Sequence, residues 1–101
     1  MTVKRVGYPG LIPYGTQVMS LSNSTAGTPN ASLLAAHLWL LSVETNAVRF
    51  WADGTPTLTT GVLLATGKHE ITGVCSDWAP RFQRSTGAAK VTIQGFRYEA
   101  A

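Results

Sequence analysis

The chain has 101 residues, of which 45% are hydrophobic and 13% are charged, and its formal net charge is +3. This length accommodates one domain and excludes multidomain enzymes, while ordinary hydrophobicity with a low net charge excludes a disordered chain. Because an average soluble domain is about 25% charged, we expect much of this surface to be uncharged and to contact other proteins.

The first 30 residues are predicted to form an N-terminal arm and a first strand, ahead of a β-rich body over residues 31–101, within a single domain overall. Gly15 to Leu21 alternates in polarity, which predicts a half-buried strand with Met19 and Leu21 on one face. Residues 22–30 are small and polar, as in a long loop or the joint of an arm. We expect this N-terminal segment to anchor on a partner in extended form, or to be an ordinary first strand. Its candidate interface residues are Val3, Val6, Tyr8, Leu11, Ile12 and Tyr14.

The stretch from Ala31 to Val43 suits a helix by propensity and a doubly buried strand by continuity. Residues 47–51 alternate, and residues 44–46 resemble a turn, so we predict a hairpin from about His37 to Trp51. A short helical turn over residues 31–35 is the alternative for the start of this stretch.

The second half of the chain contains further short strands separated by turns. Residues 52–56, with the sequence Ala-Asp-Gly-Thr-Pro, predict a chain reversal. Residues 62–64 and 69–72 are predicted to form a second hairpin, followed by strands over 78–84 and 90–98. In the last strand Val91 and Phe96 have opposite parity, so we predict a β-bulge at Gln94-Gly95 that turns both side chains to one face.

Six to eight short strands without helix–strand alternation predict an all-β fold. We expect a small antiparallel β-sandwich or jelly-roll-like barrel with an extended N-terminal arm.

The chain offers little that resembles a catalytic or metal site. His69 and Glu70 are adjacent, so on a strand they point to opposite faces and do not form a base–carboxylate pair. His37 lies in an apolar run, where a core or interface histidine is the simpler interpretation. Cys75 has no Cys-x-x-Cys partner, and we expect a buried or half-buried thiol. We therefore predict no enzyme activity, no cofactor and no metal.

The single cysteine also excludes an intrachain disulfide framework. Residues 1–9 contain Gly and Pro where a signal peptide has its apolar region, so none is expected. The longest apolar run, residues 33–41, is far shorter than the roughly 20 residues of a membrane span, so no membrane partner is expected.

Aromatic and basic residues concentrate in the C-terminal quarter, as in a single-strand nucleic-acid binder. Core-facing rings with solvated arginines between them explain the same pattern, and no RNP-like motif is present. Exposed tryptophans are also typical of sugar binding. Nucleic acid is therefore not the expected partner, and a carbohydrate- or nucleic-acid-binding β module is kept as an alternative.

One stretch resembles a known group of proteins. It comprises Glu44 to Thr57 with the run Val-Arg-Phe-Trp-Ala-Asp-Gly-Thr, then Gly61 to Ala65, Ile71 to Gly73, Arg81 to Gln83 and Val91 to Ile93. These motifs resemble small β-rich virion proteins of tailed bacteriophages and cover about two-thirds of the chain, from residue 37 to residue 98. The N-terminal 30 residues depart from the pattern.

The resemblance implies a non-enzymatic structural virion protein, with a capsid decoration or cement protein as the favoured role. Such a protein would be made in the host cytoplasm and would bind the major capsid protein or another virion protein, and we expect a homo-oligomer. A tail, baseplate or head-to-tail junction component is the alternative within the particle. The tryptophans Trp39 and Trp51 complete the candidate interface residues.

Overall fold

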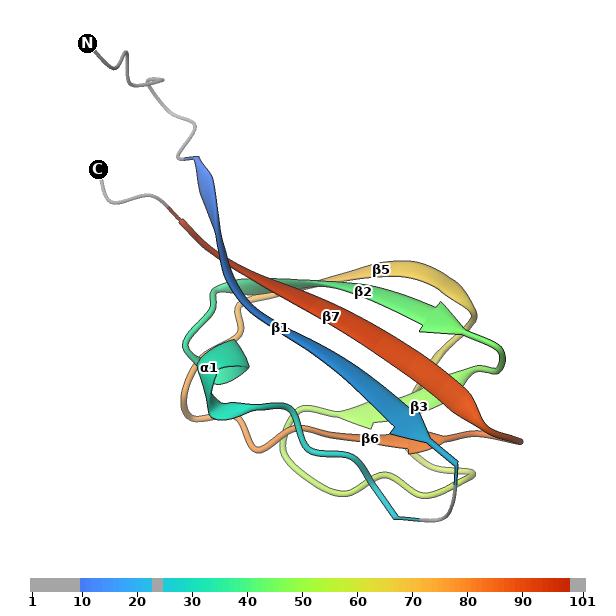
Figure 1. The fold of residues 1–101 in the computed structure, drawn as a ribbon. Coiled ribbons are helices and arrows are strands. Elements are labelled where there is room, and N and C mark those ends of the chain that lie inside the picture. Colours follow the sequence, from blue (N-terminus) through green and yellow to red (C-terminus); the bar gives the residue numbers. More distant parts are fainter. Residues whose placement is uncertain (1–9, 23–24, 99–101) are drawn as a thin grey trace, which may run out of the picture.

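The computed structural model describes residues 10–22 and 25–98, which are mostly strand (Figure 1). The strands are β1 (Leu11–Leu21), β2 (Leu38–Glu44), β3 (Val48–Trp51), β4 (Val62–Leu64), β5 (Gly67–Thr72), β6 (Arg81–Arg84) and β7 (Ala89–Tyr98). The helix α1 (Ala31–Leu34) lies between β1 and β2. The all-β prediction is confirmed. In the described part of the chain no helix has the length and apolar character needed to cross a membrane.

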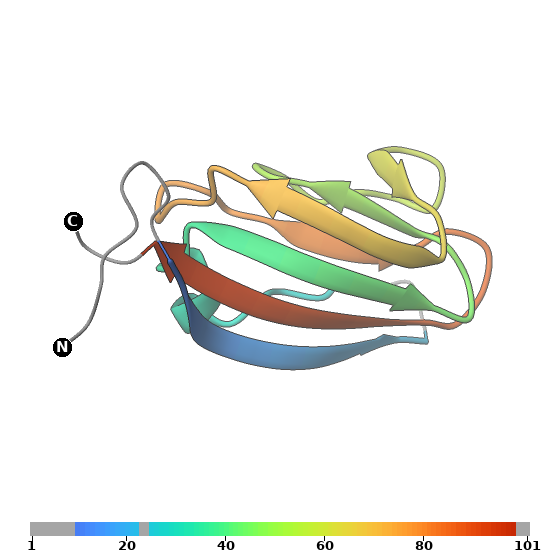
Figure 2. The same ribbon diagram turned by 90° about the horizontal axis from the view of Figure 1, so that it is seen from above.

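The strands form two antiparallel sheets. The large sheet has the order β1-β7-β2-β5, which can be followed by colour in Figure 2, and the small sheet has the order β4-β3-β6. Alternating residues of both sheets point into one shared core, because successive side chains of a strand lie on opposite faces. The outer faces of the two sheets are therefore left for solvent or for partners.

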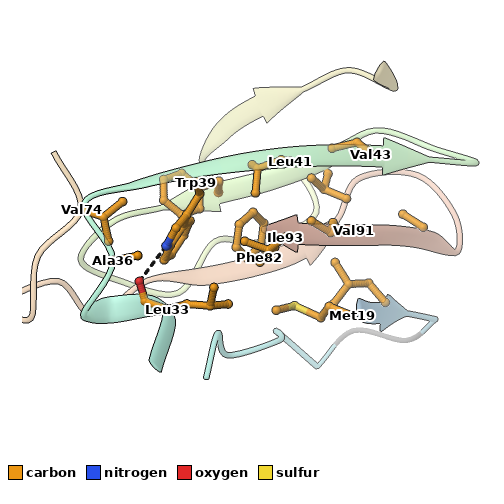
Figure 3. Close-up of a cluster of buried hydrophobic side chains, with 14 residues drawn as sticks. Met19, Leu33, Ala36, Trp39, Leu41, Val43, Val74, Phe82, Val91 and Ile93 are labelled. Carbon is orange, nitrogen blue, oxygen red and sulfur yellow. Dashed lines mark hydrogen bonds between the residues drawn. The ribbon is translucent and has the colours of Figure 1, made fainter. Parts of the chain in front are cut away.

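Aromatic rings fill the centre of this core (Figure 3). Trp39 of β2 has no exposed surface, and its ring centroid lies 6.5 Å from that of Phe50 and 6.4 Å from that of Phe82, both on the small sheet. The indole Nε1 of Trp39 donates a hydrogen bond of 2.7 Å to the carbonyl oxygen of Leu33 in α1. Trp39 thus ties the helix and the two sheets together.

The two predicted hairpins are wrong, although their strands exist. β2 and β3 lie in different sheets, and so do β4 and β5. Between β2 and β3 the chain crosses from the large sheet to the small one, and Thr45 in this connection has a φ of 77°. The predicted reversal over residues 52–56 is placed only coarsely: β3 and β4 pair in antiparallel fashion, so the chain reverses within residues 52–61, where the backbone N–H of Thr57 donates to the carbonyl oxygen of Thr60. The helical turn kept as an alternative is present as α1.

The predicted β-bulge in β7 is also wrong, because the irregularity lies in the neighbouring strand. β7 pairs with β2 in unbroken register, whereas β1 carries two residues, Tyr14 and Gly15, opposite the single residue Gly95. Gly95 takes the buried place in the alternation, and Phe96 is only partly buried on the other face. A Cβ atom at Gly95 would overlap the Tyr14 carbonyl oxygen and lie 3.0 Å from Ala36 Cβ. A glycine is required here because two backbones approach each other closely.

The first strand is longer than predicted and belongs to the large sheet. β1 begins at Leu11 and pairs with β7 as far as Leu21. The predicted alternation is confirmed, since Met19 and Leu21 are buried and Val18 is 59% exposed. The side chain of Gln17 accepts a hydrogen bond from the backbone N–H of Asn30, which fixes the return of the chain toward α1.

Candidate interaction surface

The residues singled out for catalysis have structural contacts. His69 Nε2 lies 2.7 Å from the carbonyl oxygen of Ala65, within the turn before its own strand. Glu70 pairs with Leu40 on the opposite face of the sheet and is exposed. Among residues 10–22 and 25–98, no group of three or more His, Cys, Asp or Glu side chains is placed to hold a metal ion.

His37 is engaged by the C-terminal strand. Its Nδ1 accepts a 3.0 Å hydrogen bond from the backbone N–H of Tyr98, and the two rings stack with centroids 5.4 Å apart. Both contacts hold the end of β7 against the start of β2, which is a structural role. Cys75 is exposed, contrary to the expectation of a buried thiol, and lies with His37 and Arg97 along a shallow hollow of about 320 Å³.

The aromatic residues of the C-terminal quarter serve mainly for packing. Phe82 is fully buried, and the ring of Trp78 meets Trp39 edge-on with centroids 6.2 Å apart. Phe96 is partly buried beside Leu38 on the large sheet. These rings do not form the exposed row that would stack on successive bases.

A cluster of exposed apolar side chains lies instead where β1 and β7 run on past the other strands (Figure 1). We call it the terminal ribbon and define it as Leu11, Ile12, Tyr14 and Tyr98. Leu11 and Ile12 are each 49% exposed and Tyr98 is 45% exposed, although β1 and β7 are paired in register here. Such a concentration of large apolar side chains on a two-stranded projection is suited to burial against a protein.

The terminal ribbon is held in place by contacts on its inner side. Gly15 adopts a φ of +84° and lets β1 bend at the bulge. Leu33 of α1 packs beneath it, so that a Cβ atom added at Gly15 would lie 3.2 Å from Leu33 Cδ2. The guanidinium carbon of Arg97 lies 5.2 Å from the centre of the Tyr14 ring, a distance at which a cation and an aromatic face attract each other. These contacts hold the ribbon in place, with Leu11 and Tyr98 on one of its faces and Ile12 on the other.

A second exposed apolar area lies on the small sheet and the loop before β4. We call it the small-sheet patch, and it comprises Trp51, Leu58 and Leu63, all of them exposed. Val62, also exposed, lies opposite Phe50 on the other face of the edge strand. Leu63 lies opposite Arg49, whose Nη1 donates a 3.3 Å hydrogen bond to the carbonyl oxygen of Gly61. The patch combines an indole ring, aliphatic side chains and an arginine, a composition typical of protein interfaces.

The predicted interface residues divide into three groups. Leu11, Ile12, Tyr14 and Trp51 are exposed, the first three together in the terminal ribbon. Trp39 is a correction, since it is fully buried and hydrogen-bonded in the core and offers no surface to a partner. Val3, Val6 and Tyr8 lie outside the described residues.

Several exposed apolar residues were not anticipated from the sequence: Val18, Leu40, Leu58, Val62, Leu63 and Tyr98. Val62, Leu63 and Leu64 form a continuous apolar run, which normally indicates a strand buried on both faces. Here the run forms the edge of the small sheet, and two of its three side chains are exposed. Sheet order, which the sequence does not reveal, decides their exposure.

Charge contributes little to the surface of the described residues. Lys90 Nζ and Glu44 Oε2 form an ion pair of 4.0 Å in which both side chains are about half exposed, an arrangement of small energetic value. The arrangement of the surface is thus suited to bury apolar area and to form hydrogen bonds at strand edges.

Comparison of the chain with protein-family models, with curated proteins and with solved structures finds no match. The features that bear on function are therefore the two exposed apolar surfaces, the edges of the sheets and the motifs of the sequence.

Proposed function

We propose that this chain is a non-enzymatic structural protein of a tailed-bacteriophage particle, which binds the outside of the head as a capsid decoration or cement protein. The observation that carries the proposal is the terminal ribbon, where exposed Leu11, Ile12, Tyr14 and Tyr98 lie on a paired two-stranded projection. The assignment to a phage particle rests on the resemblance of the strand-and-turn motifs to small phage virion proteins. The low charge content favours a surface that is covered by neighbours.

In this proposal the terminal ribbon contacts the major capsid protein and the small-sheet patch provides further contact area. Binding of this kind requires apolar anchors surrounded by polar groups and no chemical step. The protein would be made in the host cytoplasm and would reside in the virion as a homo-oligomer. A position in the tail, the baseplate or the head-to-tail junction would use the same surfaces.

The test is binding of the purified chain to phage heads that lack it. Ile12→Ser removes an aliphatic anchor from the terminal ribbon and should weaken binding by about tenfold or more. Leu40→Ser is the matched control, because Leu40 is 44% exposed on the middle of the large sheet and outside the ribbon. Equal loss with both variants, or no loss with Ile12→Ser, would contradict the assignment of the ribbon, and failure of the native chain to bind heads would contradict the decoration role.

A further inference from the structure

The two sheets have four edge strands, and three of them are protected against pairing with another chain. β4 has only three residues. β6 is covered by Gly27, which exchanges two backbone hydrogen bonds of 2.7 and 2.9 Å with Phe82. β5 carries the charged side chains of Lys68 and Glu70. Short length, cover and charge are the devices by which proteins prevent association of sheet edges.

The fourth edge, β1, has none of these devices along its second half. It is 11 residues long, contains no charged residue and, among residues 10–22 and 25–98, has one hydrogen-bonded neighbouring strand, β7. Pro13 and the bulge at Tyr14-Gly15 interrupt its first half, but Thr16 to Leu21 run in unbroken register. Alternate residues of this segment direct their backbone N–H and C=O groups away from β7, as on any antiparallel edge.

The neighbouring segment does not occupy this edge. Among the described residues of the return toward α1, Gly27 directs its backbone hydrogen bonds to β6. The contact of Thr28 and Asn30 with β1 passes through the side chain of Gln17, which lies on the core-facing parity of the strand. Within the part of the chain that the structure describes, no strand pairs with the backbone edge from Thr16 to Leu21, although the core beneath this edge is closed.

We propose that this edge pairs with the same edge of a second copy, in antiparallel fashion about a two-fold axis at Val18. In this register Val18 lies opposite the partner's Val18, and Thr16 lies opposite the partner's Ser20. The two four-stranded sheets then form one continuous sheet of eight strands. Val18, 59% exposed in the single chain, is covered by its own counterpart.

A second copy fits this edge better than a foreign strand because the edge is uncharged. A strand with charges of one sign would repel its own copy and select a partner of opposite sign, whereas β1 offers no charge for such selection. The bulge at Tyr14-Gly15 also favours a two-fold axis at Val18, because a pairing centred further toward the N-terminus would include the bulge. A two-fold contact of this kind is closed and stops at a dimer.

This dimer would be the homo-oligomer expected of the proposed virion protein, so its biological role rests on the proposed function. The dimer itself can be measured on the purified chain alone. Light scattering coupled to gel filtration should give twice the 10.8 kDa mass of one chain. Val18→Lys places two ammonium groups opposite each other and should reduce the mass to that of one chain. Leu40→Lys adds the same charge to the same sheet face on the interior strand β2 and should leave the dimer intact.

A complementation experiment tests the register. Val18→Glu alone should also be monomeric, and an equimolar mixture of Val18→Lys and Val18→Glu should recover the doubled mass, because opposite charges then meet across the axis. Circular dichroism of each variant checks that the fold is retained. Recovery together with a folded Val18→Lys monomer supports the proposal.

Three results would overturn the self-pairing: a monomeric native chain, a dimer that Val18→Lys leaves unchanged, or a mixture that stays monomeric. Binding to phage heads is scored separately. A monomer that binds heads disproves the pairing and leaves the proposed function standing, whereas a dimer that does not bind heads does the reverse.

Discussion

Replacing Gly95 by alanine tests how the bulge of β1, helix α1 and β7 fit together. A Cβ atom at this position would overlap the carbonyl oxygen of Tyr14 and lie 3.0 Å from Ala36 Cβ and 3.1 Å from Leu33 Cδ2. The φ of Gly95 is not positive, so its backbone conformation is open to alanine. In the folded state the effect of Gly95→Ala is therefore one of space.

The magnitude follows from two opposing contributions. Inserting a methyl group into a filled core costs about 1–3 kcal/mol, and the upper part of that range applies here because a backbone carbonyl does not rotate away as a side chain does. Alanine recovers about 0.5–1 kcal/mol by restricting the unfolded chain. We expect Gly95→Ala to lower the free energy of unfolding by about 2 kcal/mol, or the Tm by roughly 8–16 °C for a domain of this size.

Urea unfolding followed by tryptophan fluorescence measures this change. Gly54→Ala is the control, since a Cβ atom at Gly54 meets nothing within 4 Å and the φ of Gly54 is not positive either. It should leave stability within about 0.5 kcal/mol of the native value or raise it slightly. A Gly95→Ala variant as stable as the Gly54→Ala control would refute the close approach of β1 and β7 on which the position of the terminal ribbon depends.

Three further changes test other parts of the fold. Trp39→Phe removes the hydrogen bond to the Leu33 carbonyl and should cost about 1–3 kcal/mol in urea unfolding, and an unchanged midpoint would show that this bond contributes nothing. Thr45→Gly relieves a β-branched residue at a φ of 77° and should raise the free energy of unfolding by about 1 kcal/mol, whereas a loss of stability would contradict the strain. Cys75 is exposed and should react with a thiol reagent as completely in the native protein as in urea, so a protected thiol would contradict its position.

The strands of this protein were largely predictable from the sequence, but their partners were not. Alternation and turn residues located most of the strands, because burial on one face imposes a period of two. These signals did not predict how β2 and β3 are connected at residues 44–46. A turn between two strands is compatible both with a hairpin and with a crossing to the other sheet, and the structure has the crossing. What distinguishes the two is the packing of Trp39 of β2 against Phe50 of β3 across the core, which is a tertiary effect.

The parity break at Gly95 shows a related limit. The opposite parity of Val91 and Phe96 was visible in the sequence and correctly marked an irregularity at this place along β7. The extra residue nevertheless belongs to β1, because the position opposite Gly95 in the paired strand holds both Tyr14 and Gly15. A single strand's sequence gives the place of such a defect and does not show which of two paired strands contains it.

Only some of the candidate interface residues were predicted correctly to be exposed, because exposure depends on how the strands are arranged. Leu11, Ile12 and Tyr14 were selected as apolar anchors of an N-terminal segment, and they are exposed on the ribbon. Trp39 was selected as an aromatic residue, yet an indole with a backbone partner is readily buried. Val18 was not anticipated, because its significance depends on β1 being an uncharged edge, which only the order of the strands reveals.

The proposed place of this chain in a phage head is tested most directly by counting the chain in purified particles. Quantitative mass spectrometry of intact virions and of separated tails gives its copy number relative to the major capsid protein. A decoration protein should be present in the intact particle at a number comparable with that of the capsid protein and absent from the tail fraction. A copy number equal to that of the tail proteins would assign the chain to the tail. Absence from the particle would contradict its proposed role as a virion protein.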